Sequence, residues 1–220
     1  MMRALAGAGR RNRGQTPSAR VLAFVLAAMV ALPVLLAPGP AAAQKSAQVY
    51  FFRGFFGGAF SMGLDGIAGR LAQQGIIARV YSWREKRAAE NDILSSTLSG
   101  PIVLVGHSFG ANAALSLADQ LASRGVPISL VITLDPTFDG PVSPSVARYR
   151  NYYLSVDALV TEVNAFGKAL EIPDGMAGRV ENIDIRDRAD ITYISESHWN
   201  MTENAVLARE VHSQIIQALR

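Results

Sequence analysis

Short apolar runs alternate with amphipathic stretches along most of this chain. The apolar runs are rich in β-branched and aromatic residues, which is typical of buried strands, and they lie at 48–52, 76–83, 101–105, 128–134, 148–154 and 180–185. Apolar residues with helical spacing predict helices over 61–74, 84–98, 111–123 and 204–219. Strands that alternate with helices predict an α/β fold of three layers, in which a mostly parallel sheet lies between helices on both faces.

Residues 156–178 have a less definite pattern. Apolar positions between Leu159 and Leu170 suggest a short helix, which would cover the sheet or form a small flap over a site. The segment leaves no room for a large cap domain. The last strand is expected at 180–185, with 191–194 as the alternative.

The first 43 residues follow a different pattern. Five arginines accompany an apolar run from Val21 to Ala37, and the small residues 41–43 come after it. This order is typical of a secretory signal peptide that is cleaved before Gln44. We therefore expect an exported protein, periplasmic or secreted, whose residues 44–220 form a single domain. The apolar run approaches membrane-spanning length, so an uncleaved anchor in the inner membrane is the alternative.

The positive net charge of +3 comes from that segment. Residues 1–43 hold five of the 21 basic residues and none of the 18 acidic ones, so the remainder carries 16 basic residues against 18 acidic ones. Nucleic-acid binding therefore has no electrostatic support, and a membrane is expected as a partner only through an uncleaved N-terminal segment. The chain has no cysteine, which excludes disulfides and a thiolate nucleophile, and its three histidines lack metal-ligand spacing. We expect no metal and no cofactor.

The segment 106–110 reads Gly-His-Ser-Phe-Gly and joins the apolar run 101–105 to a helix that begins with small residues. The segment thus places a serine between two glycines, after a strand and before a helix. This is the order of a nucleophile elbow, in which the serine occupies a strained turn. Glycines are expected at 106 and 110 because a Cβ would crowd the turn or the helix beside it. Ser108 is therefore the candidate nucleophile.

A serine nucleophile needs a base, and this chain has only three histidines. His107 adjoins the serine, so its side chain should point away from the face that Ser108 presents and pack beside the elbow. His212 lies within the apolar periodicity of the last predicted helix and should sit on the surface of that helix. His198 lies in a polar loop before that helix, where it could reach the serine. His198 is the predicted base.

The base is usually oriented by a carboxylate. Asp135 ends the strand that follows the elbow helix, and Pro136 stops the strand there, so Asp135 should lie at the same sheet edge as Ser108. Asp157 follows the next strand-like run and is the alternative acid. Asp139 is a third and more distant candidate. We expect Asp135 to be the acid.

The chain order serine, aspartate, histidine is that of α/β-hydrolases. With the elbow at 106–110, this order makes residues 48–220 resemble a small member of the α/β-hydrolase superfamily, of the serine esterase, lipase or thioesterase type. The resemblance implies a three-layer α/β-hydrolase fold without a large cap. In that superfamily the acid more usually lies one strand later than Asp135 does here, which keeps Asp157 open.

Acyl transfer also needs two backbone N–H groups that stabilise the oxyanion. The residue after the serine supplies one of them, which is Phe109 here. The glycine-rich turn after the strand 48–52 resembles the turn that supplies the other in many α/β-hydrolases, with Arg53 where a histidine often stands. That resemblance implies Phe55 as the second donor, with Phe56 as the alternative.

These features together predict an exported serine hydrolase that cleaves an ester or thioester through an acyl-enzyme intermediate. The substrate would be a small-molecule or lipid acyl compound. Two alternatives remain, an acyltransferase that uses the same three residues and a non-catalytic binding protein on the same fold.

Overall fold

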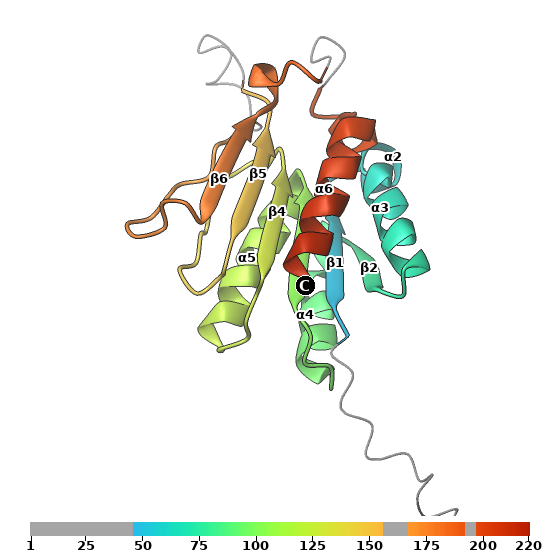
Figure 1. Cartoon of the computed structure of the whole chain (residues 1–220), viewed down its shortest axis with the longest axis vertical. Helices are drawn as coiled ribbons and strands as arrows, with labels where there is room; N and C mark the ends of the chain where they lie inside the picture. Colours follow the sequence, from blue (N-terminus) through green and yellow to red (C-terminus); the bar gives the residue numbers. More distant parts are fainter. Residues whose placement is uncertain (1–45, 156–166, 192–196) are drawn as a thin grey trace, which may run out of the picture. The chain divides into compact units, whose positions relative to one another are not determined.

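Six strands form one sheet, and every strand pairing among the described residues is parallel (Figure 1). The computed structural model describes residues 46–155, 167–191 and 197–220, all of which belong to one compact unit. The strands are β1 (Gln48–Arg53), β2 (Ile77–Ser82), β3 (Ile102–His107), β4 (Leu130–Leu134), β5 (Tyr149–Tyr153) and β6 (Val180–Asp184). They lie in the order β2-β1-β3-β4-β5-β6.

Helices cover both faces of this sheet. They are α2 (Gly57–Phe60), α3 (Met62–Gln73), α4 (Lys86–Ser95), α5 (Phe109–Ser123) and α6 (Ala205–Ala218), with short 3-10 turns η2 (Trp83–Glu85), η3 (Ile185–Asp187) and η4 (Met201–Glu203). The α4 and α5 helices pack on one face, and α3 and α6 pack on the other. The predicted three-layer α/β fold is confirmed, and no cap domain is inserted among the described residues.

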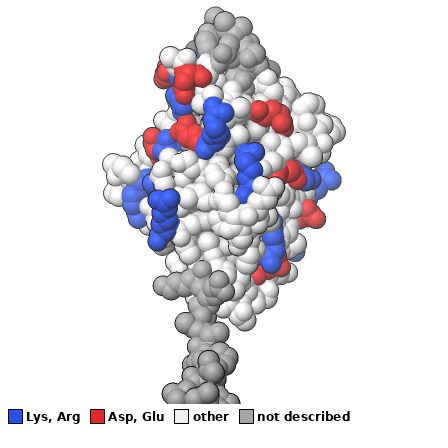
Figure 2. Space-filling view, turned by 45° about the vertical axis from the view of Figure 1, so that its right-hand side comes forward, with Lys and Arg blue, Asp and Glu red and all other residues white. Residues whose placement is uncertain are grey.

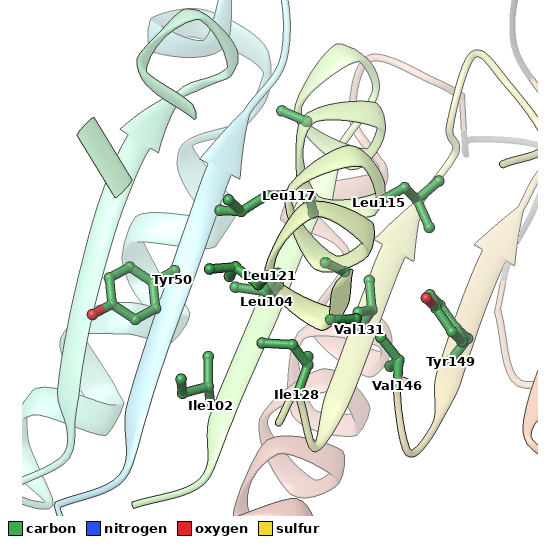
Figure 3. Close-up of a cluster of buried hydrophobic side chains, with 14 of the residues drawn as sticks. Tyr50, Ile102, Leu104, Leu115, Leu117, Leu121, Ile128, Val131, Val146 and Tyr149 are labelled. Carbon is green, nitrogen blue, oxygen red and sulfur yellow. The ribbon is translucent and has the colours of Figure 1, made fainter. Parts of the chain in front are cut away.

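The central strands β1, β3 and β4 are buried on both faces of the sheet because they are apolar on both sides. In β1, Tyr50 and Phe52 point toward α4 and α5, whereas Val49 and Phe51 point toward α3 and α6. Figure 3 shows the first of these layers, in which side chains of β3, β4 and α5 interdigitate with Tyr50. The loops at the carboxyl ends of the strands leave from this packed centre.

The helix predicted over 84–98 begins as η2 and continues as α4 only from Lys86. The Ser82 hydroxyl accepts from the backbone N–H of Arg84, and the Glu85 carboxylate accepts from the backbone N–H of Ser82. This reciprocal capping starts the helical turn directly at the end of β2. The sequence pattern also gave no sign of α2, which lies inside the predicted glycine-rich turn.

Of the two alternatives for the last strand, 180–185 corresponds to β6. Residues 192–194 of the other lie outside the described residues, as do 156–166 of the segment predicted to contain a short helix. The described part of that segment, 167–178, contains no helix. The predicted signal peptide also lies outside the described residues, and within them every helix is too short or too polar to cross a bilayer.

Charged side chains of both signs are interspersed over the face seen in Figure 2. Among the described residues some charged side chains are paired, as in the contacts of Arg150 with Glu181 and Glu210, which join β5 to β6 and α6. Such pairs between partly exposed groups contribute little to stability. This mixed surface agrees with the nearly equal numbers of basic and acidic residues after position 43.

The order of the strands reverses between β1 and β3, so the connections that leave these two strands run to opposite sides of the sheet. In open parallel sheets such a reversal leaves a crevice at the carboxyl ends of the strands, where ligands bind. The loop after β1 and the turn after β3 meet at this point.

Candidate active site

Ser108 lies in the sharp turn between β3 and α5. Its backbone has φ 57° and ψ −127°, a conformation that L-residues rarely adopt. Hydrogen bonds hold the turn in place, because Ser108 N–H donates to the Leu134 carbonyl at 2.9 Å and Ala111 N–H donates to the Ser108 carbonyl at 2.9 Å. The serine hydroxyl is thereby presented at the carboxyl edge of the sheet.

The two glycines that frame the serine allow close approaches of the backbone. A Cβ on Gly106 would lie 2.2 Å from the Gly110 carbonyl oxygen, and a Cβ on Gly110 would lie 2.0 Å from the Phe52 carbonyl oxygen. Neither neighbour is a flexible side chain that could move aside. The crowding expected at both positions is therefore present.

His198 bridges Ser108 and Asp135. Its Nε2 lies 2.9 Å from Ser108 Oγ, and its Nδ1 lies 2.8 Å from Asp135 Oδ2. All three residues are buried, although they are separated by up to 90 positions in the chain. Among the described residues the predicted nucleophile, base and acid thus form one continuous hydrogen-bonded series.

The Asp135 carboxylate is held from two sides. Its Oδ1 accepts backbone N–H groups of Leu154 and Gly167, each at 3.1 Å, which leaves Oδ2 to face His198. The backbone of Asp135 is left-handed, with φ 50°, and its N–H donates to the Tyr152 carbonyl at 2.7 Å. Because an ionised carboxylate only accepts hydrogen bonds, His198 carries its proton on Nδ1 and offers the Nε2 lone pair to Ser108.

Among the described residues, the candidate acid Asp139 does not enter this network. Asp157 lies outside them. Asp139 is exposed on the surface, and the hydrogen bond that it makes through its backbone carbonyl is to Glu171 N–H at 2.8 Å.

The loop after β1 packs directly against the serine. A Cβ on Gly54 would lie 2.8 Å from Ser108 Cβ, so only glycine allows the loop this close. Gly54 N–H donates to Ser61 Oγ at 3.2 Å. The two predicted oxyanion donors, Phe55 and Phe109, directly follow Gly54 and Ser108, and their ring centroids are 6.1 Å apart. Their backbone N–H groups therefore lie on the two segments that meet at the serine.

A family model for the thioesterase domain matches residues 88–214, which include β3, the serine turn, Asp135 and His198. The chain belongs to the thioesterase domain family. Together with the parallel sheet and its covering helices, this membership confirms the resemblance to the α/β-hydrolase superfamily. No curated protein matches the chain in a sequence comparison.

The solved structures that match this thioesterase domain have little sequence in common with it. The NocB thioesterase domain of the nocardicin cluster is 15% identical, with a TM-score of 0.43 over 80% of this chain and 95% of that chain. A putative hydrolase of the alpha/beta superfamily from Xanthomonas campestris pv. campestris is 16% identical, with a TM-score of 0.40 over 78% and 99%. YbtT, a type II thioesterase of yersiniabactin biosynthesis, is 11% identical, with a TM-score of 0.41 over 84% and 98%.

His107 makes a contact that the sequence did not predict. In addition to the packing beside the elbow that the sequence predicts, its Nε2 lies 2.8 Å from the His198 carbonyl oxygen and its Nδ1 lies 2.9 Å from Ser61 Oγ. A carbonyl only accepts, so Nε2 carries the proton and Nδ1 accepts from the Ser61 hydroxyl. A continuous series of hydrogen bonds therefore joins the loop after β1 to the loop that carries the predicted base. It runs from Gly54 N–H to the Ser61 hydroxyl, from that hydroxyl to His107, and from His107 to the His198 carbonyl.

His107 remains neutral in this position. Burial, reinforced by the nearby His198, lowers the pKa of His107 to about 4. In the unfolded chain a histidine titrates near 6.5, so the unfolded state takes up this proton first. The stability that neutral His107 contributes is complete above about pH 6.5 and is lost as the pH falls toward 4.

We expect His107→Phe to lower kcat by about tenfold to a hundredfold with little change in KM, because the loop that carries His198 loses the donor that positions it. His107→Gln keeps an N–H that can reach the same carbonyl and should recover part of kcat. A purely structural role would instead lower the amount of folded enzyme and leave kcat per folded molecule unchanged. Active-site titration together with urea unfolding separates the two.

Two cavities open beside the serine turn. The larger has a volume of about 590 Å³, and the smaller, of about 280 Å³, reaches Gly54 and Phe55. Both are bordered by Trp83 and Arg84. The larger cavity is lined by Phe109, Ala113 and Phe138 on its apolar side and by Arg84, Lys86 and Arg87 on its basic side.

Proposed function

We propose that this thioesterase domain is an exported serine hydrolase that cleaves an acyl thioester, or a related ester, through an acyl-enzyme intermediate. The observation that carries the proposal is the bridge formed by His198 between Ser108 and Asp135. Membership of the thioesterase domain family supports a thioester as the bond that is cleaved.

In the acylation step, Ser108 Oγ attacks the acyl carbonyl carbon while His198 Nε2 takes the hydroxyl proton. Asp135 holds the imidazole in the required tautomer and stabilises the imidazolium that forms. Backbone N–H groups of Phe109 and Phe55 stabilise the tetrahedral oxyanion. The carbon–sulfur bond then breaks, the departing thiolate takes the proton from His198, and the acyl group remains on Ser108.

In the second step, water attacks the acyl-enzyme with His198 again as the base, and the acid product leaves. The acyl group would occupy the 590 Å³ cavity, because Phe109 both lines that cavity and directly follows the serine. The apolar side chains of Ala113 and Phe138 suit an apolar acyl group.

The test combines covalent labelling with product analysis. A fluorophosphonate should label the purified protein once, at Ser108, and short acyl thioesters should release one thiol for each acid formed. Because the chain has no cysteine, a thiol-reactive dye reports only the product. Acyl transfer to an added alcohol with little free acid would favour an acyltransferase, and the absence of labelling and turnover would contradict the proposal.

The export part of the proposal rests on the pattern of residues 1–43. Mass spectrometry of the protein recovered from the periplasm or medium should show a chain that begins at or near Gln44. An intact Met1 terminus in the membrane fraction would indicate the uncleaved anchor. Full-length protein in the cytoplasm would contradict both forms of export.

A further inference from the structure

Exposed large apolar side chains gather around the candidate active site. The described residues contain eight such side chains, and six of them lie at the carboxyl edge of the sheet. We call these six the apolar rim: Phe55, Phe56, Phe60, Met62, Phe138 and Trp199. The other two, Leu94 and Ile172, lie on α4 and in the loop before β6.

Two chains of aromatic contacts connect the rim to the site from different sides. On one side, Phe56 contacts Phe55 with ring centroids 4.3 Å apart, and Phe55 lies 6.1 Å from Phe109. On the other side, the ring centroid of Phe60 lies 5.0 Å from that of Trp199, which in turn lies 5.1 Å from that of His198. Four of the six rim residues are thus linked by ring contacts to Phe109, which follows Ser108, or to His198.

Two side chains of the rim are more than half exposed. Phe56 is 65% exposed and Phe138 is 62% exposed. Single exposed apolar residues are common on protein surfaces, but several gathered at one edge of the sheet, near a candidate site, favour a surface that binds something apolar.

The chemistry of the rim favours a lipid surface. Phenylalanine and tryptophan are the residues that partition into the interface between water and lipid. Arg84 and Arg87 border the cavity behind Phe109 and Phe138, and neither makes an ion pair with another described residue. Exposed guanidinium groups beside apolar side chains attract the anionic headgroups of lipids.

We propose that the apolar rim docks on the surface of a bilayer or lipid aggregate that contains anionic lipids, so that acyl groups enter the site from that surface. The inference rests on the proposed function only for the fate of the acyl group, since docking itself does not require catalysis. The occupant of the rim is a lipid surface and not another protein.

The test compares vesicle binding by four forms of the whole protein. They are the wild type, the rim variant Phe60→Gln/Met62→Gln, the matched control Leu94→Gln/Ile172→Gln, and the charge variant Arg84→Gln/Arg87→Gln. The control replaces side chains of similar exposure, 45% and 48%, that lie elsewhere. Any binding through the N-terminal segment is common to all four forms and cancels in the comparison.

Cosedimentation is measured with vesicles of phosphatidylcholine alone and of phosphatidylcholine with phosphatidylglycerol. We expect the wild type and the control to bind the mixed vesicles, and the rim variant to bind about tenfold more weakly. The charge variant should lose the preference for mixed vesicles, and added salt should have the same effect on the wild type. The tryptophan fluorescence of the wild type, which comes from Trp83 and Trp199, should shift to the blue on binding.

Equal binding by the rim variant and the control would overturn the proposal. Absence of binding by the wild type would also overturn it. If the wild type then forms a concentration-dependent dimer and the rim variant does not, the partner of the rim is a second copy of this chain. Turnover of a soluble short-chain thioester is measured in the same samples. Normal turnover without rim-dependent binding would contradict the docking proposal and leave the proposed hydrolase standing. Rim-dependent binding without turnover would contradict the proposed hydrolase and leave docking standing.

Discussion

Replacement of Ser108 by alanine is expected to lower kcat for thioester hydrolysis by about 10⁶-fold and to abolish fluorophosphonate labelling. The variant lacks the oxygen that would form the proposed acyl-enzyme, whereas the proposed oxyanion donors, Phe109 and Phe55, and the proposed acyl cavity remain. A small residual rate above that in water should therefore persist. Initial rates and intact-mass measurements after labelling provide the check.

The fold should survive this change. The backbone of Ser108 is fixed by hydrogen bonds to Leu134 and Ala111 that the side chain does not make, and removal of one hydroxyl opens no appreciable cavity. Thermal unfolding of the variant should thus match that of the wild type within a few degrees. Ser95→Ala, which changes an exposed serine on α4, is the matched control and should retain full activity. Near wild-type turnover by the Ser108 variant would refute the assignment of the nucleophile.

Replacement of Asp135 by asparagine is expected to lower kcat by about 10⁴-fold. The reason lies in the two N–H groups, from Leu154 and Gly167, that donate to Asp135 Oδ1. They would select the asparagine rotamer in which the amide oxygen stays at that position, so that the amide NH₂ faces His198 Nδ1. His198 would then carry its proton on Nε2, and its lone pair would no longer be available to the Ser108 hydroxyl.

Two measurements check this prediction. Nitrogen NMR of the imidazole rings, which number only three in this chain, should report the change of tautomer at His198. Asp157→Asn is the comparison variant, because Asp157 is the alternative acid, and it should retain most of the activity. The opposite result, an inactive Asp157 variant and a mildly affected Asp135 variant, would move the acid one strand later.

The sequence alone was sufficient for those features that depend on residues close together in the chain. The central strands β1, β3 and β4 are apolar on both faces because both faces are covered, so they could be recognised as short apolar runs. The serine turn could be recognised because the close approaches at Gly106 and Gly110 permit no side chain there. Family membership follows from the same 88–214 region of the sequence.

The tertiary structure decided the contacts between distant segments. His107 and His198 are 91 positions apart, and no periodicity in the sequence encodes their contact. The sequence left Asp135 and Asp157 open because both follow strand-like runs, whereas the distance from His198 to Asp135 depends on how the loop before α6 crosses the sheet edge. The apolar rim likewise arises from loops that come together only when the sheet forms. Local patterns fix which residues form strands, but only the packing of the layers brings loop residues close together, because loop positions depend on the whole sheet.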